Sequence, residues 1–250
     1  MAARQLVLWD IDHTLIDTRG VGRELSAMAF ERVTGMAMRV QAKIDGITEP
    51  VIFRETAKLH GLLTGRALFE RFAEALAEAH LTRFAELRER GHALPGAAAA
   101  LNAMAMMPGV VQTVVTGNVR SVAETKLQVF GLDGYINWGI GAFGEDNDTR
   151  AELIRIALER AERAFGQPIT PSQAVVIGDT PADVEAAFKN GVSMIAVASG
   201  RSSSSDLYEA GNHYLEVQRS SDRNGMRPEF HVLPNLMNTA SVLALVRRAD

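Results

Sequence analysis

Four short apolar runs, separated by helical patterns, restrict the fold of this 250-residue chain more than any other feature. The runs occupy residues 6–9, 110–115, 174–177 and 194–198, and they are largely β-branched or apolar rather than alternating. Such runs are typical of parallel strands that are covered on both faces. Amphipathic helical patterns lie between or after them, at residues 97–107, 121–130, 150–165 and 182–190. This alternation predicts an α/β fold with a doubly wound, mostly parallel sheet.

One segment departs from this alternation. From about Arg19 to His92 there is no strand pattern, only amphipathic helical patterns such as the one at residues 67–90. We therefore predict two domains. Residues 1–17 and 93–250 form an α/β core, and residues 18–92 form an all-helical domain inserted after the first strand. Ligands of such sheets bind at the carboxyl ends of the strands, so a helical insert at this point is placed to act as a lid.

The chain after residue 214 gives a weaker pattern. Residues 219–225 are polar and rich in turn formers, and Asn224-Gly225 is a strong hairpin signal. We interpret residues 214–234 as a surface hairpin or a partly disordered insertion. Residues 238–248 have the pattern of a closing helix.

Composition excludes several classes of protein. The formal net charge is -4 and Lys and Arg are scattered, so we expect no nucleic-acid partner. The absence of cysteine excludes a disulfide scaffold, a thiolate metal site and a cysteine nucleophile. The N-terminal segment lacks a signal-peptide pattern, and no apolar run is long enough to span a bilayer. We therefore expect a cytoplasmic protein without a membrane partner, as a monomer or a homodimer.

Polar residues at the ends of the predicted strands form the candidate site. They are Asp10, Asp12, Thr14, Thr116, Asp179 and Asp183. Strand ends of a doubly wound sheet converge on one crevice, where four carboxylates would repel one another unless a cation offset their charge. Mg²⁺ suits such oxygen ligands and commonly bridges carboxylates to a phosphate. A carboxylate can also act as a covalent nucleophile, and a second acid two residues later can act as general acid and then base.

Thr116 continues this site towards a phosphate. Together with the backbone amides of Gly117 and Asn118, at the start of the next helix, it would form an anion site of the helix N-terminal kind. The residues alone therefore indicate metal-assisted phosphoryl transfer through an aspartyl-phosphate.

Three motifs in order resemble those of the haloacid dehalogenase-like hydrolase superfamily. Asp10-Ile11-Asp12-His13-Thr14 looks like its DxDxT motif, and Val115-Thr116-Gly117-Asn118 is similar to its second motif. Gly178-Asp179-Thr180-Pro181-Ala182-Asp183 matches its acidic fourth motif. The helical insert after the first motif agrees as well, so the resemblance covers most of the chain. It is greatest to the phosphoglycolate phosphatase-like branch, which carries a small helical cap on a Rossmann-like core.

The resemblance implies a Mg²⁺-dependent phosphatase that hydrolyses a phosphate monoester of a small metabolite. Asp10 would be the nucleophile, and Asp12 would protonate the leaving alcohol and then activate water. Mg²⁺ would bind Asp10, Asp179 and the backbone carbonyl of Asp12, with Asp183 in support. Thr116 would hydrogen-bond the transferring phosphoryl group.

Four residues are expected beside the substrate, namely His13, Thr14, Gly117 and Asn118. The family's phosphatases most often carry glycine at the position of His13, so this histidine is a departure. We expect its side chain to point towards the leaving group or the cap. The glycine-containing break at residues 43–49 is similar to a cap loop that dips into the site and selects substrates, although a plain interhelical connection is an equal alternative.

The cationic third motif has two candidates. The family places a lysine at the start of the helix before the fourth motif, and Arg150 holds that position here. An arginine supplies the charge and a bidentate phosphate contact, although its shape differs from that of lysine. Lys126 is the competitor, but it follows Thr116 by ten residues and is expected more than two helical turns away, at ~1.5 Å rise per residue. We therefore favour Arg150.

Two other functions are compatible with these residues. A phosphomutase of the same superfamily would keep all of them. A catalytically silent protein on this scaffold would bind the metal or phosphate without turnover. The identity of the phosphate ester is not readable from the sequence.

Overall fold

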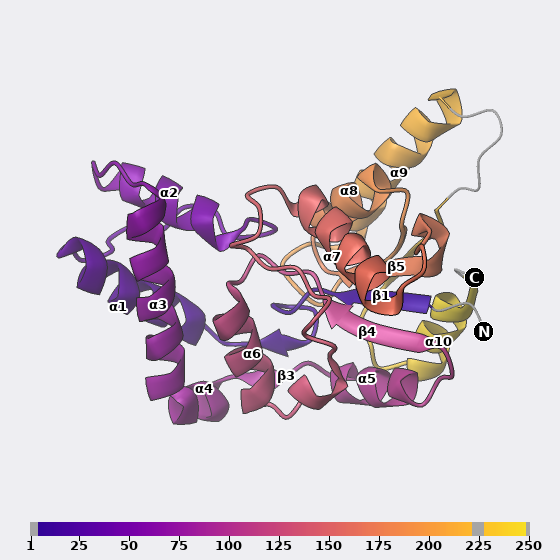
Figure 1. Cartoon of the computed structure of the whole chain (residues 1–250), viewed down its shortest axis with the longest axis horizontal. Helices are drawn as coiled ribbons and strands as arrows, with labels where there is room; N and C mark the ends of the chain where they lie inside the picture. Colours follow the sequence, from indigo (N-terminus) through magenta and orange to yellow (C-terminus); the bar gives the residue numbers. More distant parts are fainter. Residues whose placement is uncertain (1–4, 222–227, 249–250) are drawn as a thin grey trace.

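A five-stranded parallel sheet of order β4-β1-β5-β6-β7 forms the centre of the protein in the computed structural model, which describes residues 5–221 and 228–248 (Figure 1). The strands are β1 (Gln5–Trp9), β4 (Val110–Val114), β5 (Ala174–Gly178), β6 (Ser193–Val197) and β7 (Phe230–Leu233). The first four lie at the predicted runs. In the middle of the sheet Leu8 pairs with Thr113 on one side and Val176 on the other. The predicted α/β class is confirmed.

Both faces of the sheet are covered because its central strands are apolar on both sides. Val7 and Trp9 enter one buried cluster, whereas Leu6 and Leu8 enter the other. The first face is covered by α5 (Ala97–Ala105), α6 (Arg120–Val129) and α10 (Thr239–Arg248). The second is covered by α7 (Arg150–Phe165), α8 (Pro181–Lys189) and α9 (Ser204–Ser221). These layers make the sheet doubly wound, as predicted.

Four helices build a second lobe, on the left in Figure 1. They are α1 (Val21–Thr34), α2 (Glu49–Leu59), α3 (Arg66–Thr82) and α4 (Phe84–Arg90). The lobe has an apolar cluster that it shares with Val122 and Val129 of α6, and in it Phe53 stacks on Phe72 with ring centroids 4.4 Å apart. The pattern at residues 67–90 is thus two helices that meet at Arg83.

A two-stranded antiparallel ribbon joins this lobe, called the cap below, to the core. It pairs β2 (Ile16–Asp17) with β3 (His92–Ala93), so both crossings of the chain lie side by side. The domain limits of 17/18 and 92/93 fall on this ribbon and stay a prediction.

The hairpin prediction for residues 214–234 was wrong where the structure describes them. Residues 214–221 continue α9, and β7 pairs in parallel with β6, for example Ile195 with His231. Parallel neighbours need a crossover, usually a helix, and α9 lies on that crossover. Its Tyr214 stacks on Phe188 with centroids 5.9 Å apart. Asn224-Gly225 lies outside the described residues.

The closing helix predicted at residues 238–248 is confirmed as α10. Among the described helices, none has the length and apolar character that crossing a membrane would require.

Candidate active site

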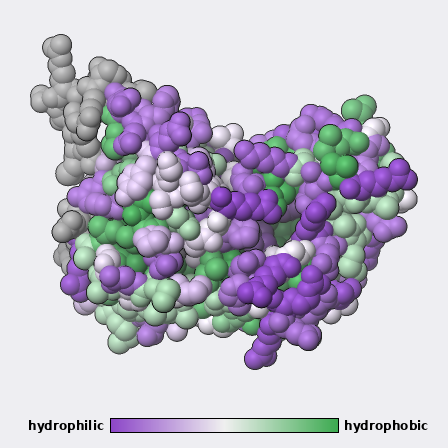
Figure 2. Space-filling model, turned by 180° about the vertical axis from the view of Figure 1, so that it is seen from behind, coloured by the Kyte–Doolittle hydropathy of each residue, from purple (hydrophilic) through white to green (hydrophobic). Residues whose placement is uncertain are grey.

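The carboxyl ends of β1, β4 and β5 meet at a cavity of about 150 Å³ beneath the cap. Figure 2 shows the surface hollowed between the two lobes, with hydrophilic residues along the rim. Most of the predicted site residues line this cavity, namely Asp10, Asp12, His13, Thr116, Gly117, Asn118, Arg150 and Asp179. The other two stand directly behind it. Thr14 donates a hydrogen bond to Asp179 at 3.3 Å, and Asp183 contacts Arg150.

Three buried aspartates form the part of the site that suits a metal ion. One carboxylate oxygen each of Asp10, Asp179 and Asp183 lies within 4.8 Å of the others. Burial raises the pKa of Asp10 to about 7 and that of Asp179 to about 9, and the mutual repulsion of these acids adds to both shifts. A divalent cation would remove this repulsion, and an all-oxygen donor set fits Mg²⁺.

Gly200 leaves the space that Asp179 needs. A Cβ on Gly200 would lie 1.8 Å from Asp179 Oδ2 and 3.0 Å from His13 Cβ, so only glycine allows the loop after β6 to approach this closely. The Asp179 carboxylate therefore lies between the Thr14 hydroxyl and the backbone of Gly200. The backbone carbonyl of Asp12 accepts no backbone hydrogen bond among the described loop contacts, which leaves it available as the further oxygen ligand that was predicted.

Both carboxylate oxygens of Asp183 accept hydrogen bonds that hold the local structure of the site. Its Oδ2 accepts hydrogen bonds from the amide and hydroxyl of Thr180 at 3.0 and 2.7 Å, which forms the capping box of α8. Its Oδ1 accepts from Arg150 Nε at 2.6 Å. Asp183 therefore fixes α8 and Arg150 around the metal-binding group.

Arg150 joins the nucleophile candidate to this frame. It is the first residue of α7 and is buried, with Nη2 2.7 Å from Asp10 Oδ1. Burial opposes its charge, but Asp10 and Asp183 outweigh that effect and raise the pKa of Arg150. A permanent cation thus lies beside Asp10, as the third motif requires.

Lys126 also reaches the site, so the expectation that it lies too far away was wrong. Its Nζ donates to both carboxylate oxygens of Asp12, at 2.9 and 2.7 Å, and to Asn118 Oδ1 at 2.7 Å. That expectation considered only the rise of the helix backbone between Thr116 and Lys126. Side chains of a helix lean towards its N-terminus, and α6 directs its N-terminus at the cavity, so the long lysine chain covers the gap.

Asn118 ties the first and second motifs together through its side chain. Its Nδ2 donates to Asp12 Oδ2 at 2.7 Å and to Thr116 Oγ1 at 2.8 Å. Although burial raises the pKa of Asp12, Lys126 and Asn118 outweigh it and hold that pKa below its ordinary value. Asp10 and Asp12 are therefore two residues apart with opposite pKa shifts.

The predicted anion site differs in detail from its expectation. The Asn118 amide donates to Thr116 Oγ1 at 3.3 Å, so of the two predicted amides only that of Gly117 has no partner among the described residues. Helix α6 begins at Arg120, two residues beyond Asn118. The phosphate-binding groups are thus in the loop that precedes the helix.

His13 takes the backbone conformation that favours glycine. Its φ is 61°, in the left-handed region, which explains why glycine is usual at this position. The Ser199 hydroxyl donates to the His13 carbonyl at 2.7 Å and anchors the turn. His13 is among the residues that line the cavity, and the direction of its side chain towards a leaving group stays a prediction.

The cap loop of residues 43–49 docks onto the second motif. The Glu49 amide donates to the Gly117 carbonyl at 2.8 Å, and Thr48 Oγ1 donates to the Asp148 carbonyl at 3.1 Å. A Cβ on Gly117 would lie 2.4 Å from the Ile47 carbonyl oxygen. The loop therefore closes over the cavity, and the alternative of a plain connection does not describe it.

One cap residue in the cavity, His80, was missed by sequence reasoning, and Glu49 was placed only as the last residue of the loop at residues 43–49. Glu49 is an acid in the first turn of α2, and His80 lies within the amphipathic pattern of α3. Both line the cavity, and both interact electrostatically with Asp12 and Lys126. For His80 the only available signal was its place in a helical insert, because the docking of the cap is a tertiary contact.

Comparison with known proteins agrees with this geometry. A model of the haloacid dehalogenase-like hydrolase family matches residues 7–187, a span that includes the three motifs and the cap. No curated protein matches the chain.

Several solved structures share the fold over nearly the whole chain. A hydrolase from Pseudomonas syringae is 18% identical with a TM-score of 0.64, and covers 97% of this chain and 99% of its own. A protein named as a predicted phosphatase, from Clostridium acetobutylicum, is 19% identical with a TM-score of 0.59 and coverages of 99% and 98%. One named provisionally as a beta-phosphoglucomutase, from Bacteroides vulgatus, is 17% identical with a TM-score of 0.62 and coverages of 99% and 90%.

At these identities the structural likeness establishes the fold and leaves the substrate open, and the phosphoglycolate phosphatase-like branch stays a prediction. The family model spans well over half of the sequence, and the strand-end acids lie together as the family's motifs require. The chain belongs to the haloacid dehalogenase-like hydrolase family.

Proposed function

We propose that the protein is a Mg²⁺-dependent phosphatase that hydrolyses a small phosphate monoester through an aspartyl-phosphate on Asp10. The observation that carries the proposal is that Asp10 and Asp12, two acids of the same turn, have different charged neighbours. Asp10 lies between Arg150 and the acidic cluster, whereas Asp12 lies 2.7 Å from Lys126 on the other side. One acid is thus equipped to receive a phosphoryl group, and the other to exchange protons.

The two halves of the reaction follow from these roles. An Asp10 oxygen attacks phosphorus, the ester P–O bond breaks, and Asp12 gives its proton to the leaving alkoxide. Asp12 then takes a proton from water, whose oxygen attacks phosphorus and releases Asp10 with inorganic phosphate. A phosphate dianion near Asp12 raises the pKa of that acid, which favours its proton-donating form against the pull of Lys126.

The supporting groups act on charge and orientation. Thr116 Oγ1 and the Gly117 amide are the candidate contacts to the phosphoryl oxygens, with Arg150 as a fixed positive charge. Mg²⁺ would be held by Asp10, Asp179 and the Asp12 carbonyl, and would neutralise phosphate charge when bound. The cavity of about 150 Å³ favours a compact metabolite. We also propose a cytoplasmic location, without nucleic-acid or membrane partners.

The test is hydrolysis of p-nitrophenyl phosphate by the purified protein, with and without Mg²⁺. We expect phosphate release that needs Mg²⁺ and falls at least about a thousand-fold in Asp10→Asn, because the nucleophile is lost. Asp17→Asn is the matched control, since Asp17 lies only a few residues after Asp12 but does not line the cavity. Its Oδ1 accepts a hydrogen bond from the Arg19 amide at 2.7 Å. Full activity in Asp10→Asn would refute the proposal.

The same assay separates the alternatives. A phosphomutase would interconvert sugar phosphates with little release of inorganic phosphate, and a silent binding protein would bind Mg²⁺ without turning over any phosphate ester.

A further inference from the structure

A buried ring nitrogen of His80 has no hydrogen-bond partner in the described part of the chain. The side chain is 1% exposed and lines the cavity beneath the cap. Its Nδ1 lies 2.8 Å from the Leu76 carbonyl, one turn earlier in α3, whereas its Nε2 contacts no donor or acceptor. A buried polar atom without a partner is costly, so it requires an explanation.

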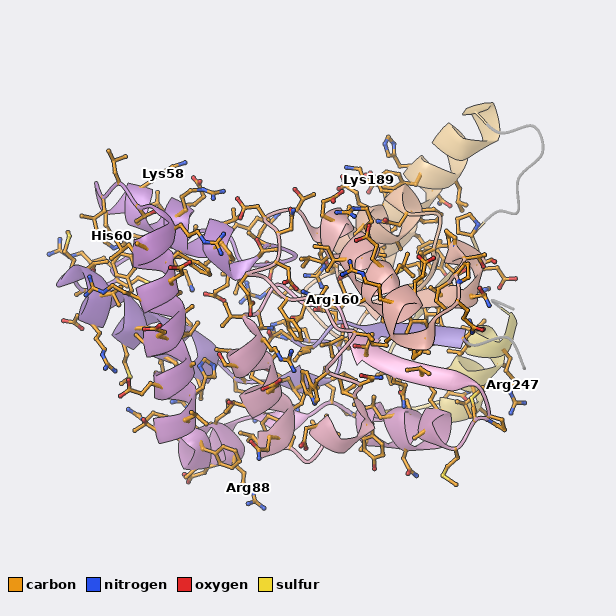
Figure 3. All side chains as sticks on the ribbon, viewed as in Figure 1. Lys58, His60, Arg88, Arg160, Lys189 and Arg247 are labelled. Carbon is orange, nitrogen blue, oxygen red and sulfur yellow. The ribbon has the colours of Figure 1, made fainter. Side chains whose placement is uncertain are left out.

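The cap contains a second histidine with the same local arrangement but a complete set of partners. His60 Nδ1 lies 2.8 Å from the Thr56 carbonyl, again four residues earlier, and its Nε2 accepts from the Arg39 amide at 2.9 Å. Figure 3 places His60 on the side of the cap that faces away from the core. The unpaired nitrogen is thus a property of the cavity-facing histidine and not of the arrangement itself.

The contact with Leu76 determines what His80 offers to a ligand. A carbonyl oxygen only accepts, so Nδ1 carries the proton. Burial lowers the pKa of His80 to about 4, so the ring is neutral near pH 7. Nε2 is therefore a lone-pair acceptor, and no donor among the described residues satisfies it.

His80 lines the same cavity as Asp12 and Lys126, and both of these residues act electrostatically on it. Asp12 is the residue that would protonate the leaving oxygen. Glu49 lines the same cavity, is influenced by the same two residues, and its carboxylate has no hydrogen bond among the described contacts. The alcohol half of a substrate would thus meet two oxygen- or nitrogen-based acceptors, and Arg23 is a cation at the exposed rim.

We propose that His80 Nε2 accepts a hydrogen bond from a hydroxyl group in the alcohol half of the substrate, with Glu49 as a second acceptor. The preferred substrates are then phosphate monoesters of polyols or sugars, and not of simple alkyl alcohols or hydroxy acids. A substrate carboxylate has no proton to donate to His80 Nε2. The inference rests on the proposed phosphatase activity and specifies its substrate class.

Glycerol 1-phosphate and n-propyl phosphate provide a matched pair of probes, because they share a three-carbon chain and differ in their hydroxyl groups. We expect kcat/KM to be about ten-fold higher for glycerol 1-phosphate, the size of effect that one buried hydrogen bond gives. In His80→Leu the value for glycerol 1-phosphate should fall to that of n-propyl phosphate, whose own value stays within about two-fold. His60→Leu is the control and should keep the ten-fold preference. Phosphoglycolate should be the poorest of the three probes.

Two further measurements separate substrate recognition from a structural role. Removing an unpaired buried nitrogen should leave the Tm of His80→Leu equal to or above that of the unsubstituted protein, whereas a structural histidine would lower it. In Asp10→Asn, which holds substrate without turnover, the ¹⁵N shift of His80 Nε2 should move with glycerol 1-phosphate and not with n-propyl phosphate.

The outcomes distinguish this inference from the proposed function. Equal losses on both probes in His80→Leu, or an unchanged preference, would overturn the role of His80 while Asp10-dependent hydrolysis stands. No hydrolysis of any phosphate monoester with Mg²⁺ would overturn the proposed function, and the inference with it.

Discussion

Lys126 gives the proposed proton-transfer residue a different electrostatic environment from that of the nucleophile. Asp12 accepts from Lys126 with both oxygens, while Asp10 shares its surroundings with two other aspartates. The pKa of Asp12 is lowered and that of Asp10 is raised, although the two acids are separated by one residue. Surroundings that shift the pKa values of two acids in opposite directions commonly give the acids different catalytic roles. Lys126 is therefore the residue that makes the pKa of Asp12 differ from that of Asp10.

Substituting Lys126 should move the pH profile of the reaction. In Lys126→Met the pKa of Asp12 rises, because burial is then opposed mainly by the hydrogen bond from Asn118. Asp12 therefore reaches the ionised form that acts as a base only at higher pH. We expect the acid limb of kcat for p-nitrophenyl phosphate, whose good leaving group makes hydrolysis of the aspartyl-phosphate limiting, to shift upward by about one to three pH units. Lys189→Met, which removes an exposed lysine paired with Glu185, should leave the limb in place. A higher KM with an unmoved limb would assign Lys126 to phosphate binding instead.

The sequence could locate the residues at strand ends but not those that reach the site from elsewhere. Asp10, Thr116 and Asp179 each follow a buried strand, and parallel strand ends converge whatever the loops do. Lys126 and His80 are positioned by the direction of a side chain and by the docking of a separate lobe. Neither property leaves a periodic signal in the sequence.

At the scale of elements, the cap loop of residues 43–49 is fastened to the core through backbone contacts on the second motif. The Glu49 amide donates to the Gly117 carbonyl, and the missing side chain of Gly117 makes room for the Ile47 carbonyl. The Arg54–Asp148 ion pair adds a contact between solvent-exposed side chains, which contributes little by comparison. The position of the cap loop is thus determined by main-chain fit at one residue.

Gly117→Ala should therefore separate the cap loop from the core without unfolding either lobe. The new Cβ would lie 2.4 Å from the Ile47 carbonyl oxygen, so the loop must move outward. We expect kcat/KM to fall about 10- to 100-fold, since a displacement of about 1 Å at a site costs this much. Gly134→Ala is the control, because a Cβ at Gly134 meets nothing within 4 Å. Unchanged activity in Gly117→Ala, with its Tm preserved, would show that closure on this residue is not needed for turnover.

Element prediction succeeded where local pattern and tertiary structure agree. The helix predicted at residues 150–165 has those same ends, because an amphipathic stripe runs from Arg150 to the left-handed Gly166. Strand β7 was missed because it is only four residues long, half-buried and preceded by a polar segment. Its pairing with β6 depends on the crossover through α9, which local turn signals do not report.

At the scale of the whole molecule, the charge of the site makes stability depend on pH and on metal. Four aspartates at the strand ends, Asp10, Asp12, Asp179 and Asp183, face two buried cations, Arg150 and Lys126. The surplus negative charge lies on Asp10 and Asp179, whose pKa values are raised to about 7 and about 9 by burial first and by repulsion second. In the metal-free folded protein, Asp10 and Asp179 therefore keep protons that they release in the unfolded chain.

The sign of the pH dependence follows from this difference in bound protons. Unfolded aspartates ionise near pH 4, so between about pH 4 and pH 9 the folded state holds more protons than the unfolded state. The free energy of unfolding of the metal-free protein should then fall as pH rises through this range. Mg²⁺ binds the ionised carboxylates, so its affinity rises over the same range and opposes the loss.

Thermal unfolding with and without Mg²⁺ at pH 5 and pH 8 measures both effects. At a Mg²⁺ concentration about 100-fold above Kd we expect a Tm increase of about 5–10 °C at pH 8 and a much smaller one at pH 5. Asp179→Asn removes a group that must take up a proton on folding at pH 8, so its metal-free Tm at pH 8 should exceed that of the unsubstituted protein while its response to Mg²⁺ is lost. An equal Mg²⁺ response at both pH values, or metal-free stability that rises from pH 5 to pH 8, would contradict this account. The acidic cluster would then be a structural feature whose charge is already balanced by Arg150 and Lys126.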